Sequence, residues 1–447
     1  MATPAGGAQQ HWSSRFAFLM AAIGSAVGLG NLWRFPFQTG QNGGSAFVFV
    51  YLLCVVLIAF PVLVAELSVG RHKGMSAVGS TRNLAIDAGR SPRWAIAGWA
   101  GVVAAFLILT TYSVVAGQVM AYSTMSFLGE FAAAPSEAAG GDDLALYGSI
   151  SASLWWHTIF MGITIAIVSR GLSGGIEKVV TLLMPIFFVM LAALSIYSVA
   201  TGAAAEALAY LFQPNFAAIR PQTVLAALGQ AFFSIGVGSA IMITYGSYLS
   251  RDEHIPNSAT IIASADTLVA MVAGLMIFPV VFAFGLDPQA GMGLIFDALP
   301  GVFAGMPAGS FVGGAFFFLA FIAALTSSIS LLQVVMSFVE EHTQLSRTTA
   351  AVLFGGLAWV VGAGAAHSGE FGSFIDDIVG LVALPLGGLL IAVFAGWVVP
   401  ADVMRGELPH ATARFFAFWR FMIRYPVPIA VSLIIISGLN ARFGLIG

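Results

Sequence analysis

Long apolar segments with almost no charge constrain this chain more than any other feature. Eleven of them follow one another, at residues 15–39, 46–70, 94–128, 152–169, 178–202, 222–249, 258–286, 311–339, 348–366, 371–400 and 425–445. About 20 apolar residues cross the hydrocarbon core of a bilayer as a helix. Because lipid offers the backbone no hydrogen-bond partners, the segments predict an all-α integral membrane protein.

The composition excludes the main soluble classes. Only 8% of the 447 residues are charged and 59% are apolar, whereas about a quarter of a soluble domain is charged. A net charge of −3 argues against a nucleic-acid partner, and the lone Cys54 excludes an internal disulfide. No enzyme signature is present, because the glycines at Gly28 and Gly30 lie inside a span rather than after a strand.

The basic residues predict an orientation. Cytoplasmic loops of membrane proteins are enriched in Lys and Arg. An N-terminus in the cytoplasm puts most of the 17 basic residues on that side, and the odd number of spans then puts the C-terminus outside. The cytoplasmic set is Arg15, Arg71, Lys73, Arg82, Arg90, Arg93, Arg170, Lys178, Arg251, Arg347, Arg405, Arg414, Arg420 and Arg424. The preference for Arg over Lys suggests a bacterial inner membrane.

Glycine interrupts the first and the sixth spans at matching places. Residues 24–31 read GSAVGLGN and residues 233–239 read FSIGVGS. A lone glycine usually marks close helix packing, but paired interruptions five spans apart indicate two broken helices from an internal repeat. Carbonyls freed at a break can coordinate a small cation, and freed amides can hold a carboxylate.

Polar side chains accompany the breaks. Asn31 follows the first break, Asp266 lies within the seventh span, and Thr326, Ser327 and Ser328 interrupt the eighth. An intramembrane carboxylate is costly and indicates a functional site, although it can also pair structurally. The hydroxyls can bond their own helix, but three in a row favour a sodium site.

These motifs resemble those of the neurotransmitter:sodium symporters, especially the bacterial amino-acid transporters of that family. The resemblance runs from about His11 through the tenth span and is strongest at 24–36, 229–248 and 323–333. It implies about 11 transmembrane helices in a LeuT-like 5+5 inverted repeat with helices 1 and 6 broken. The implied units are a cytoplasmic segment (1–14), the first repeat (15–202), the second repeat with outer loops (203–400), and a cytoplasmic loop with the last helix (401–447).

The resemblance implies two sodium sites. The first combines the carbonyl of Ala26 with Asn31, Ser234, Asp266 and the substrate carboxylate. The second combines carbonyls of Gly24, Val27 and Ala323 with the hydroxyls of Thr326 and Ser327. Two Na⁺ ions are therefore the expected cofactors.

It also implies an amino-acid pocket. The substrate carboxylate is expected at the amides of Leu29 and Gly30 and the hydroxyl of Tyr112, and the amino group at carbonyls of Ala26, Phe233 and Ser234. The full expected set is Ser25, Ala26, Gly28, Leu29, Gly30, Ile108, Tyr112, Phe233, Ser234, Gly236, Ser239, Ser327 and Leu331.

Two gates are implied by the same resemblance. Arg34 and Asp376 are expected to pair at the outer gate, with Phe233 as the lid, although both charged side chains can instead reach the interface separately. The expected inner gate is Ser247, Tyr248 and Glu341. The arginine that the family places there is Gln9 in this chain, so the usual inner salt bridge is either missing or rebuilt from Arg15.

Three departures from the family pattern bear on the substrate. Gly28 replaces the aspartate of monoamine carriers, which favours a substrate with its own carboxylate. Asp266 and Ala270 replace residues of the chloride-dependent members, so chloride is expected to be dispensable, although Tyr51, Gln230 and Ser234 still match the chloride site. The small residues Gly236 and Ser239 favour a large hydrophobic or aromatic amino acid, although Ile108 refills part of the space.

The resulting prediction is a sodium-coupled symporter that imports a neutral L-amino acid by alternating access. Two alternatives stay open: a proton-coupled transporter on the same scaffold, with Asp266 titrating, and an ion-conducting channel.

Overall fold

A computed structural model describes residues 11–133, 149–289 and 293–444. Within those ranges the chain is helical and contains no strand, which confirms the all-α prediction. Nine helices there are long and apolar enough to cross a membrane. They are Ser45–Lys73, Pro92–Leu128, Ile150–Val168, Leu172–Thr201, Ile255–Ala283, Gly309–His342, Arg347–His367, Gly369–Val398 and Ala413–Phe443.

Two interrupted helices complete the set of about eleven spans. The first consists of α1 (Arg15–Ala26) and a second half made of η1 (Gly30–Arg34) and α2 (Phe35–Gln41), with a bend of 47° between the halves. The sixth consists of α11 (Pro221–Ile235) and α12 (Ile241–Gly246), separated by residues 236–240. Both interruptions fall where the glycine pattern places them.

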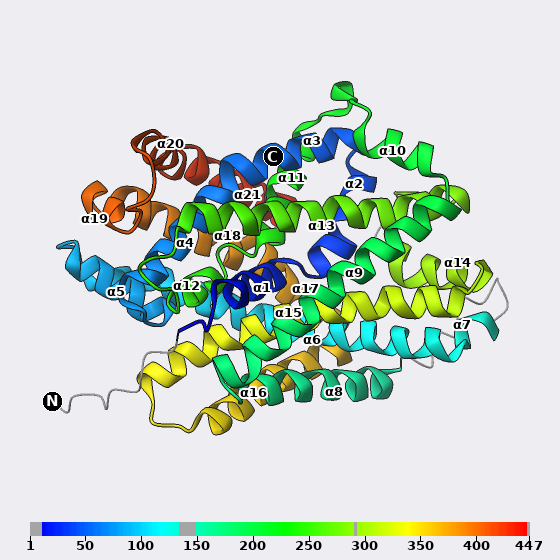
Figure 1. The fold of residues 1–447 in the computed structure, drawn as a ribbon, viewed down its shortest axis with the longest axis horizontal. Coiled ribbons are helices and arrows are strands. Elements are labelled where there is room, and N and C mark those ends of the chain that lie inside the picture. The colour runs from blue at the N-terminus through cyan, green and yellow to red at the C-terminus, as the bar shows by residue number, and fades with distance from the viewer. Residues whose placement is uncertain (1–10, 134–148, 290–292, 445–447) are drawn as a thin grey trace.

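The spans run side by side along the long axis of the molecule (Figure 1). Continuous helices form the third, fourth, seventh, eighth and ninth: α6 (Ala95–Leu128), α8 (Ile150–Val168), α13 (Ile255–Ala283), α15 (Gly309–His342) and α16 (Arg347–His367). π-Helical turns η2 (Val55–Ala59), η5 (Leu172–Ile176), η8 (Ile378–Ala383) and η9 (Phe394–Val398) interrupt or flank the others. Those are α3 (Ser45–Cys54) with α4 (Phe60–Lys73), α9 (Glu177–Thr201), and α17 (Gly369–Asp377) with α18 (Leu384–Val393).

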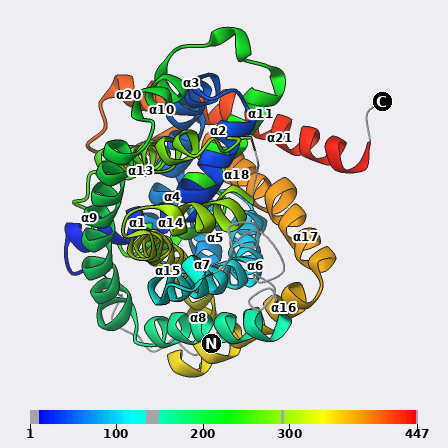
Figure 2. The same cartoon turned by 90° about the vertical axis from the view of Figure 1, so that its right-hand side faces the viewer.

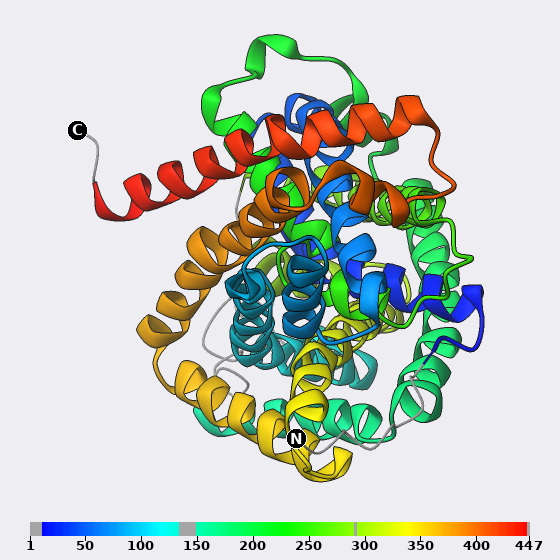
Figure 3. The same cartoon turned by 90° about the vertical axis from the view of Figure 1, so that its left-hand side faces the viewer.

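Burial separates central from peripheral spans. In the most apolar stretch of α15, 89% of the residues are buried within the protein. The corresponding share is only 17% in the last span, which consists of α20 (Ala413–Arg424) and α21 (Pro426–Phe443). Figure 2 shows α8, α9, α16 and α17 around the inner helices α1, α6 and α15, and Figure 3 shows α20 and α21 along the outside. The broken helices therefore sit in the protected interior.

Short helices close the two ends of the bundle. α5 (Ala77–Asp87) and α19 (Ala401–Gly406) lie at one end, and α10 (Ala204–Phe212) and α14 (Leu299–Gly305) lie at the other (Figure 1). The remaining short elements are η3 (Pro92–Trp94), α7 (Glu130–Ala133), η6 (Phe216–Ala218) and η7 (Leu294–Ala298).

The basic segment 401–424, expected as a loop, is largely helical. Helix α20 buries Trp419, whose indole Nε1 donates to the carbonyl of Pro61 at 2.9 Å. Arg420 donates to the carbonyls of Ala395 and Val399 at 2.7 and 2.8 Å. Aromatic anchoring and the capping of free carbonyls explain why this charged stretch packs against the bundle.

The second break depends on left-handed backbone. Gly236, Gly238 and Ala240 have φ of 71°, 90° and 58°. The amide of Gly238 donates to Glu66 Oε1 at 2.6 Å, so a carboxylate from α4 satisfies a backbone group that the break leaves free. A Cβ atom at position 238 would overlap the carbonyl oxygen of Leu384 on α18, which makes glycine necessary there.

We predict that Gly238→Ala destabilises the protein by about 2 kcal/mol or more, because the substitution adds backbone strain and a steric overlap. Thermal unfolding in detergent measures the effect. Gly229→Ala is the matched control, since Gly229 lies within α11 and a Cβ there meets nothing within 4 Å. Equal unfolding temperatures for the two variants would contradict this account of the break.

Candidate substrate and sodium site

A buried polar cluster joins the two broken helices to α13. Asn31 Nδ2 donates to Asp266 Oδ1 at 2.7 Å and to Ser234 Oγ at 3.1 Å, and Ser234 Oγ donates to Asp266 Oδ2 at 2.8 Å. The side chains are at most 2% exposed. The Tyr51 hydroxyl lies 3.4 Å from Ser234 Oγ. The structure thus brings three predicted ligands of the first sodium site together. Asn31 and Ser234 surround the carboxylate of Asp266, whose side-chain hydrogen-bond partners are neutral.

The hydroxyls of α15 face the end of α1. Thr326 Oγ1 donates to the carbonyl of Ala323 at 3.1 Å, and Ser327 Oγ lies 3.1 Å from the same carbonyl and 3.4 Å from that of Ser25. A Cβ atom at Gly24 would lie 3.2 Å from Thr326 Cβ. Thr326 and Ser327 therefore lie against the end of α1 near Gly24 and Ser25, and each hydroxyl also has a partner in its own helix.

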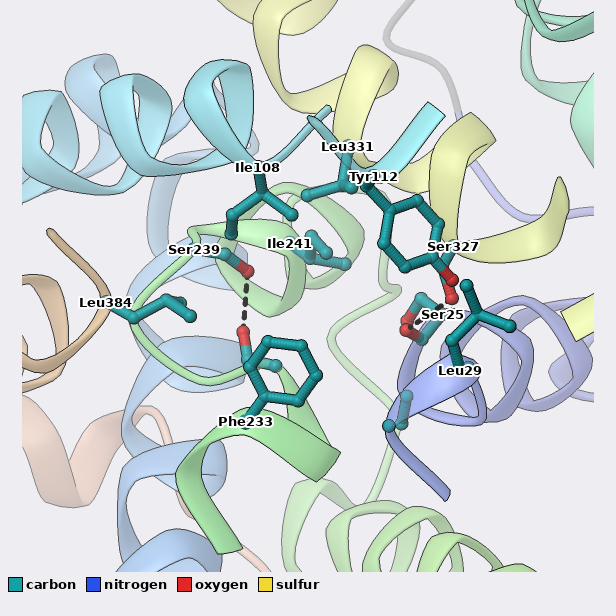
Figure 4. Close-up of a pocket in the computed structure, with 14 residues that line it drawn as sticks. Ser25, Leu29, Ile108, Tyr112, Phe233, Ser239, Ile241, Ser327, Leu331 and Leu384 are labelled. Atoms are coloured by element: carbon teal, nitrogen blue, oxygen red, sulfur yellow. Dashed lines mark hydrogen bonds between the residues drawn. The ribbon is translucent and has the colours of Figure 1, made fainter. Parts of the chain in front are cut away.

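A cavity of about 50 Å³ lies between the two breaks (Figure 4). Every predicted pocket residue except Ser234 lines it: Ser25, Ala26, Gly28, Leu29, Gly30, Ile108, Tyr112, Phe233, Gly236, Ser239, Ser327 and Leu331. Ser234 instead belongs to the Asp266 cluster. Ile241 and Leu384 also line the cavity and were missed, because an apolar residue inside an apolar span carries no distinguishing signal.

One end of the cavity is polar. A Cβ at Gly28 would lie 2.9 Å from Ser327 Oγ and 3.2 Å from the Tyr112 hydroxyl, so both hydroxyls reach the backbone of the first break. The buried Tyr112 hydroxyl lies against the Ser327 hydroxyl and the backbone of Leu29. A bound carboxylate would give such donors a charged acceptor, and a hydrogen bond to a charged group contributes about 1.5–3 kcal/mol.

A second, larger cavity of about 280 Å³ adjoins the first, and Phe233 lines both. Arg34 and Asp376 line this vestibule. The Arg34 guanidinium lies 4.3 Å from the centre of the Phe233 ring. Among the ion pairs of the described residues none joins Arg34 to Asp376. The neighbouring Asp377 pairs with Arg442 at 3.0 Å. The predicted outer-gate residues share one space without the predicted pairing.

The predicted inner-gate residues are not joined to one another. Ser247 Oγ donates to the carbonyl of Thr244 at 2.7 Å, and the Tyr248 hydroxyl accepts from Gln333 Nε2 at 2.7 Å. Glu341 accepts from the amide of Ser76 at 2.7 Å. Its carboxylate is thus committed to the start of α5, and in the described chain no bond links it to Ser247 or Tyr248. Gln9 lies outside the described residues.

A different ion-pair cluster ties this end together. Arg15 Nε lies 3.1 Å from Glu253 Oε1, whereas Glu341 was the expected acidic partner. Arg251 Nη1 lies 2.8 Å from Glu407 Oε1. His72 contacts Glu407 and Asp87 through its two ring nitrogens, each at 2.8 Å. These contacts therefore link α1, α4 and α5 to the segments that follow α12 and α19.

The pKa of Glu407 records this environment. Burial alone would raise it, but hydrogen bonds from His72 and Arg251 outweigh burial and hold the pKa of this carboxyl below its ordinary value of 4.5. A carboxyl with a lowered pKa stabilises the folded state above its ordinary pKa, and this stability is lost as the pH falls through the lowered value.

Comparisons with known proteins agree with this geometry. The profile described as "Sodium:neurotransmitter symporter family" matches residues 9–139 and 140–442. An uncharacterized sodium-dependent transporter of Bacillus subtilis (strain 168), YhdH, is 34% identical over 455 residues, covering 95% of this chain and 97% of its own. The neutral amino acid transporter B(0)AT2 of Rattus norvegicus is 25% identical over 300 residues, 60% of this chain and 40% of that protein.

A solved structure gives the same result. The crystal structure of MhsT in complex with L-phenylalanine superposes with a TM-score of 0.87 at 40% identity, covering 96% of this chain and 99% of that one. The fold and the site together define a multi-pass, sodium-dependent membrane transporter. The chain belongs to the sodium:neurotransmitter symporter family, which confirms the resemblance and the LeuT-like fold.

We predict that Glu407→Gln costs about 3 kcal/mol at pH 7, because it leaves the buried Arg71, whose Nε lies 3.6 Å from Glu407 Oε2, without a counter-charge. The unaltered protein should lose stability as the pH falls below 4.5, and the variant should lose less over that range. Thermal unfolding between pH 7 and pH 3.5 measures both effects. Asp402→Asn, an exposed change on α19, is the control. A variant that kept the full acid-dependent loss would contradict the assignment.

Proposed function

We propose that the protein is a sodium-coupled symporter that imports a neutral, large hydrophobic or aromatic L-amino acid by alternating access. The observation that carries the proposal is the cavity between the two breaks. Its polar end presents backbone groups of the first break and the buried Tyr112 hydroxyl, which suit an amino-acid carboxylate. Its other end is apolar and suits a hydrophobic side chain.

The apolar lining and two relatives support this substrate class. Gly236 and Ser239 leave room that Ile108, Leu331 and Leu384 border with hydrocarbon. The solved structure of MhsT contains L-phenylalanine, and B(0)AT2 is described as a neutral amino acid transporter. A zwitterionic substrate would have its carboxylate near Leu29 and Gly30 and its amino group at the carbonyls of Ala26, Phe233 and Ser234.

In this proposal two sodium ions accompany the substrate. The first is bound by Asn31, Ser234, Asp266 and the carbonyl of Ala26, where a cation would compensate the buried carboxylate. The second is bound by the hydroxyls of Thr326 and Ser327 with carbonyls of Gly24, Val27 and Ala323. Each entering ion contributes about 2.3 kcal/mol per 100 mV, so two would support more than a thousandfold accumulation.

Alternating access requires both ends to open in turn. From the positive-inside pattern we place the N-terminus in the cytoplasm, the C-terminus outside and the protein in a bacterial inner membrane. Arg34 and Asp376 close the outer vestibule over Phe233. The Arg15–Glu253 and Arg251–Glu407 pairs take the place of the family's inner salt bridge and release when the inner end opens.

The buried carboxylate also favours one alternative. No ion pair among the described residues involves the buried Asp266, so a proton is a second way to neutralise the charge of its carboxylate. A proton-coupled transporter on this scaffold is therefore the runner-up.

Uptake into proteoliposomes tests the proposal across the twenty amino acids. We expect saturable uptake of one hydrophobic or aromatic class in a sodium gradient and little in potassium. Replacing chloride by gluconate should leave uptake unchanged, because the Asp266 carboxylate can balance the charge of the cations. Uptake driven by a pH gradient without sodium would favour the proton-coupled alternative. Preference for glycine and alanine over leucine and tryptophan would contradict the substrate class.

Thr326→Val tests the second sodium site without changing side-chain shape. We predict about a tenfold rise in the sodium concentration for half-maximal uptake, equivalent to ~1.4 kcal/mol, because one oxygen ligand is lost. Thr124→Val is the control, since the Thr124 hydroxyl also bonds its own helix, at 3.0 Å, but is exposed on α6. An unchanged sodium requirement in Thr326→Val would remove this hydroxyl from the site.

A further inference from the structure

One wall of the cavity comes from the tenth span. Leu384, the first residue of α18, lines the cavity and is 4% exposed. Figure 4 shows it across the cavity from Leu29 and Ser25, which mark the polar end. A substrate whose carboxylate lies at the polar end would therefore extend its side chain towards Leu384.

A π-helical turn puts this leucine on the wall. Turn η8 (Ile378–Ala383) immediately precedes α18, and the amide of Leu384 donates to the carbonyl of Val379, five residues earlier. Ile375, Val379 and Leu384 pack in one apolar cluster with Ile108 and Phe233, at spacings of four and then five residues.

An uninterrupted α-helix keeps a face at spacings of three or four. Continuing the series Ile375, Val379 at that spacing would bring Ala383, with a much smaller side chain, towards the cavity. The extra residue of the π turn rotates the next helical residues by about 100°, so that Leu384 takes the position instead. The bulge therefore decides the size of the side chain at this wall.

The backbone behind Leu384 has no room to retreat. A Cβ on Gly238 would overlap the Leu384 carbonyl oxygen, and a Cβ on Gly387 would overlap the carbonyl oxygen of Gly238. The start of α18 is thus in direct backbone contact with the non-helical segment of the sixth span. Pro385, at the second position of α18, further restricts the local backbone.

We propose that Leu384 is a specificity-determining residue that limits the length of the side chain carried, and that turn η8 positions it. The inference rests on the proposed function, because it assumes an amino acid bound with its carboxylate at the Tyr112 end. Leu384 touches the far end of the substrate side chain and sets the boundary between leucine-sized and tryptophan-sized substrates.

Two opposite substitutions test the proposal in proteoliposomes, with sodium fixed and the uptake of tryptophan and valine compared. Leu384→Ala lengthens the cavity and should raise the ratio of tryptophan to valine uptake about tenfold, because each methylene in an apolar pocket is worth about tenfold or more. Leu384→Phe shortens it and should lower the same ratio. Leu386→Ala is the matched control, two residues along α18 on a side chain that is 38% exposed, and should leave the ratio unchanged.

The outcomes are distinguishable. An unchanged ratio in a folded, sodium-dependent Leu384 variant would overturn the inference and leave the proposed function standing. No sodium-dependent uptake by the unaltered protein would overturn the proposed function and the inference together. Thermal unfolding checks that each variant is folded. Should one Leu384 variant fail to fold, the direction of the ratio in the other decides.

Discussion

The structure depends on satisfying backbone polar groups where two helices are broken inside a membrane protein. Lipid supplies no hydrogen bonds, so a break survives only where protein groups replace the helical partners. Glu66 accepts the amide of Gly238, Gln230 donates to the carbonyl of Gly30, and Asn31 accepts the amide of Gly28. These side chains come from α4, α11 and η1. The packing of these inner helices therefore both satisfies the breaks and forms the site.

The same arrangement explains where charge is tolerated. Asp266 is fully buried and is held by the neutral groups of Asn31 and Ser234. In the proposed function a transported cation balances its charge. Charges at the α5 end are instead paired with one another, as Glu407 is with Arg251. The ion pairs join separate segments at that end, whereas no ion pair among the described residues involves Asp266. This difference links the folding of the bundle to coupled transport.

Much of the fold and site was predictable because membrane helices leave strong signals. The spans are predicted by apolar length, the breaks by paired glycines, and the Asp266 cluster by polar residues that lipid would exclude. The expected contact of Glu341 with the other inner-gate residues is not formed, because its carboxylate accepts from the amide of Ser76 at the start of α5. The helicity of segment 401–424 was missed, because its many arginines resemble a loop until Trp419 and Arg420 find partners in the bundle.

The sequence by itself determined the class of protein and the positions of both breaks, since each depends on local composition and spacing. The resemblance of its motifs to the sodium symporter family implied the residues around the cavity. Only the tertiary structure decided which apolar residues face the cavity. Leu384 reaches it because a π turn changes the register of the tenth span, and no periodicity in a uniformly apolar segment records that shift. The Arg15–Glu253 and Arg251–Glu407 pairs are likewise contacts between residues more than 150 positions apart, which only the folded chain brings together.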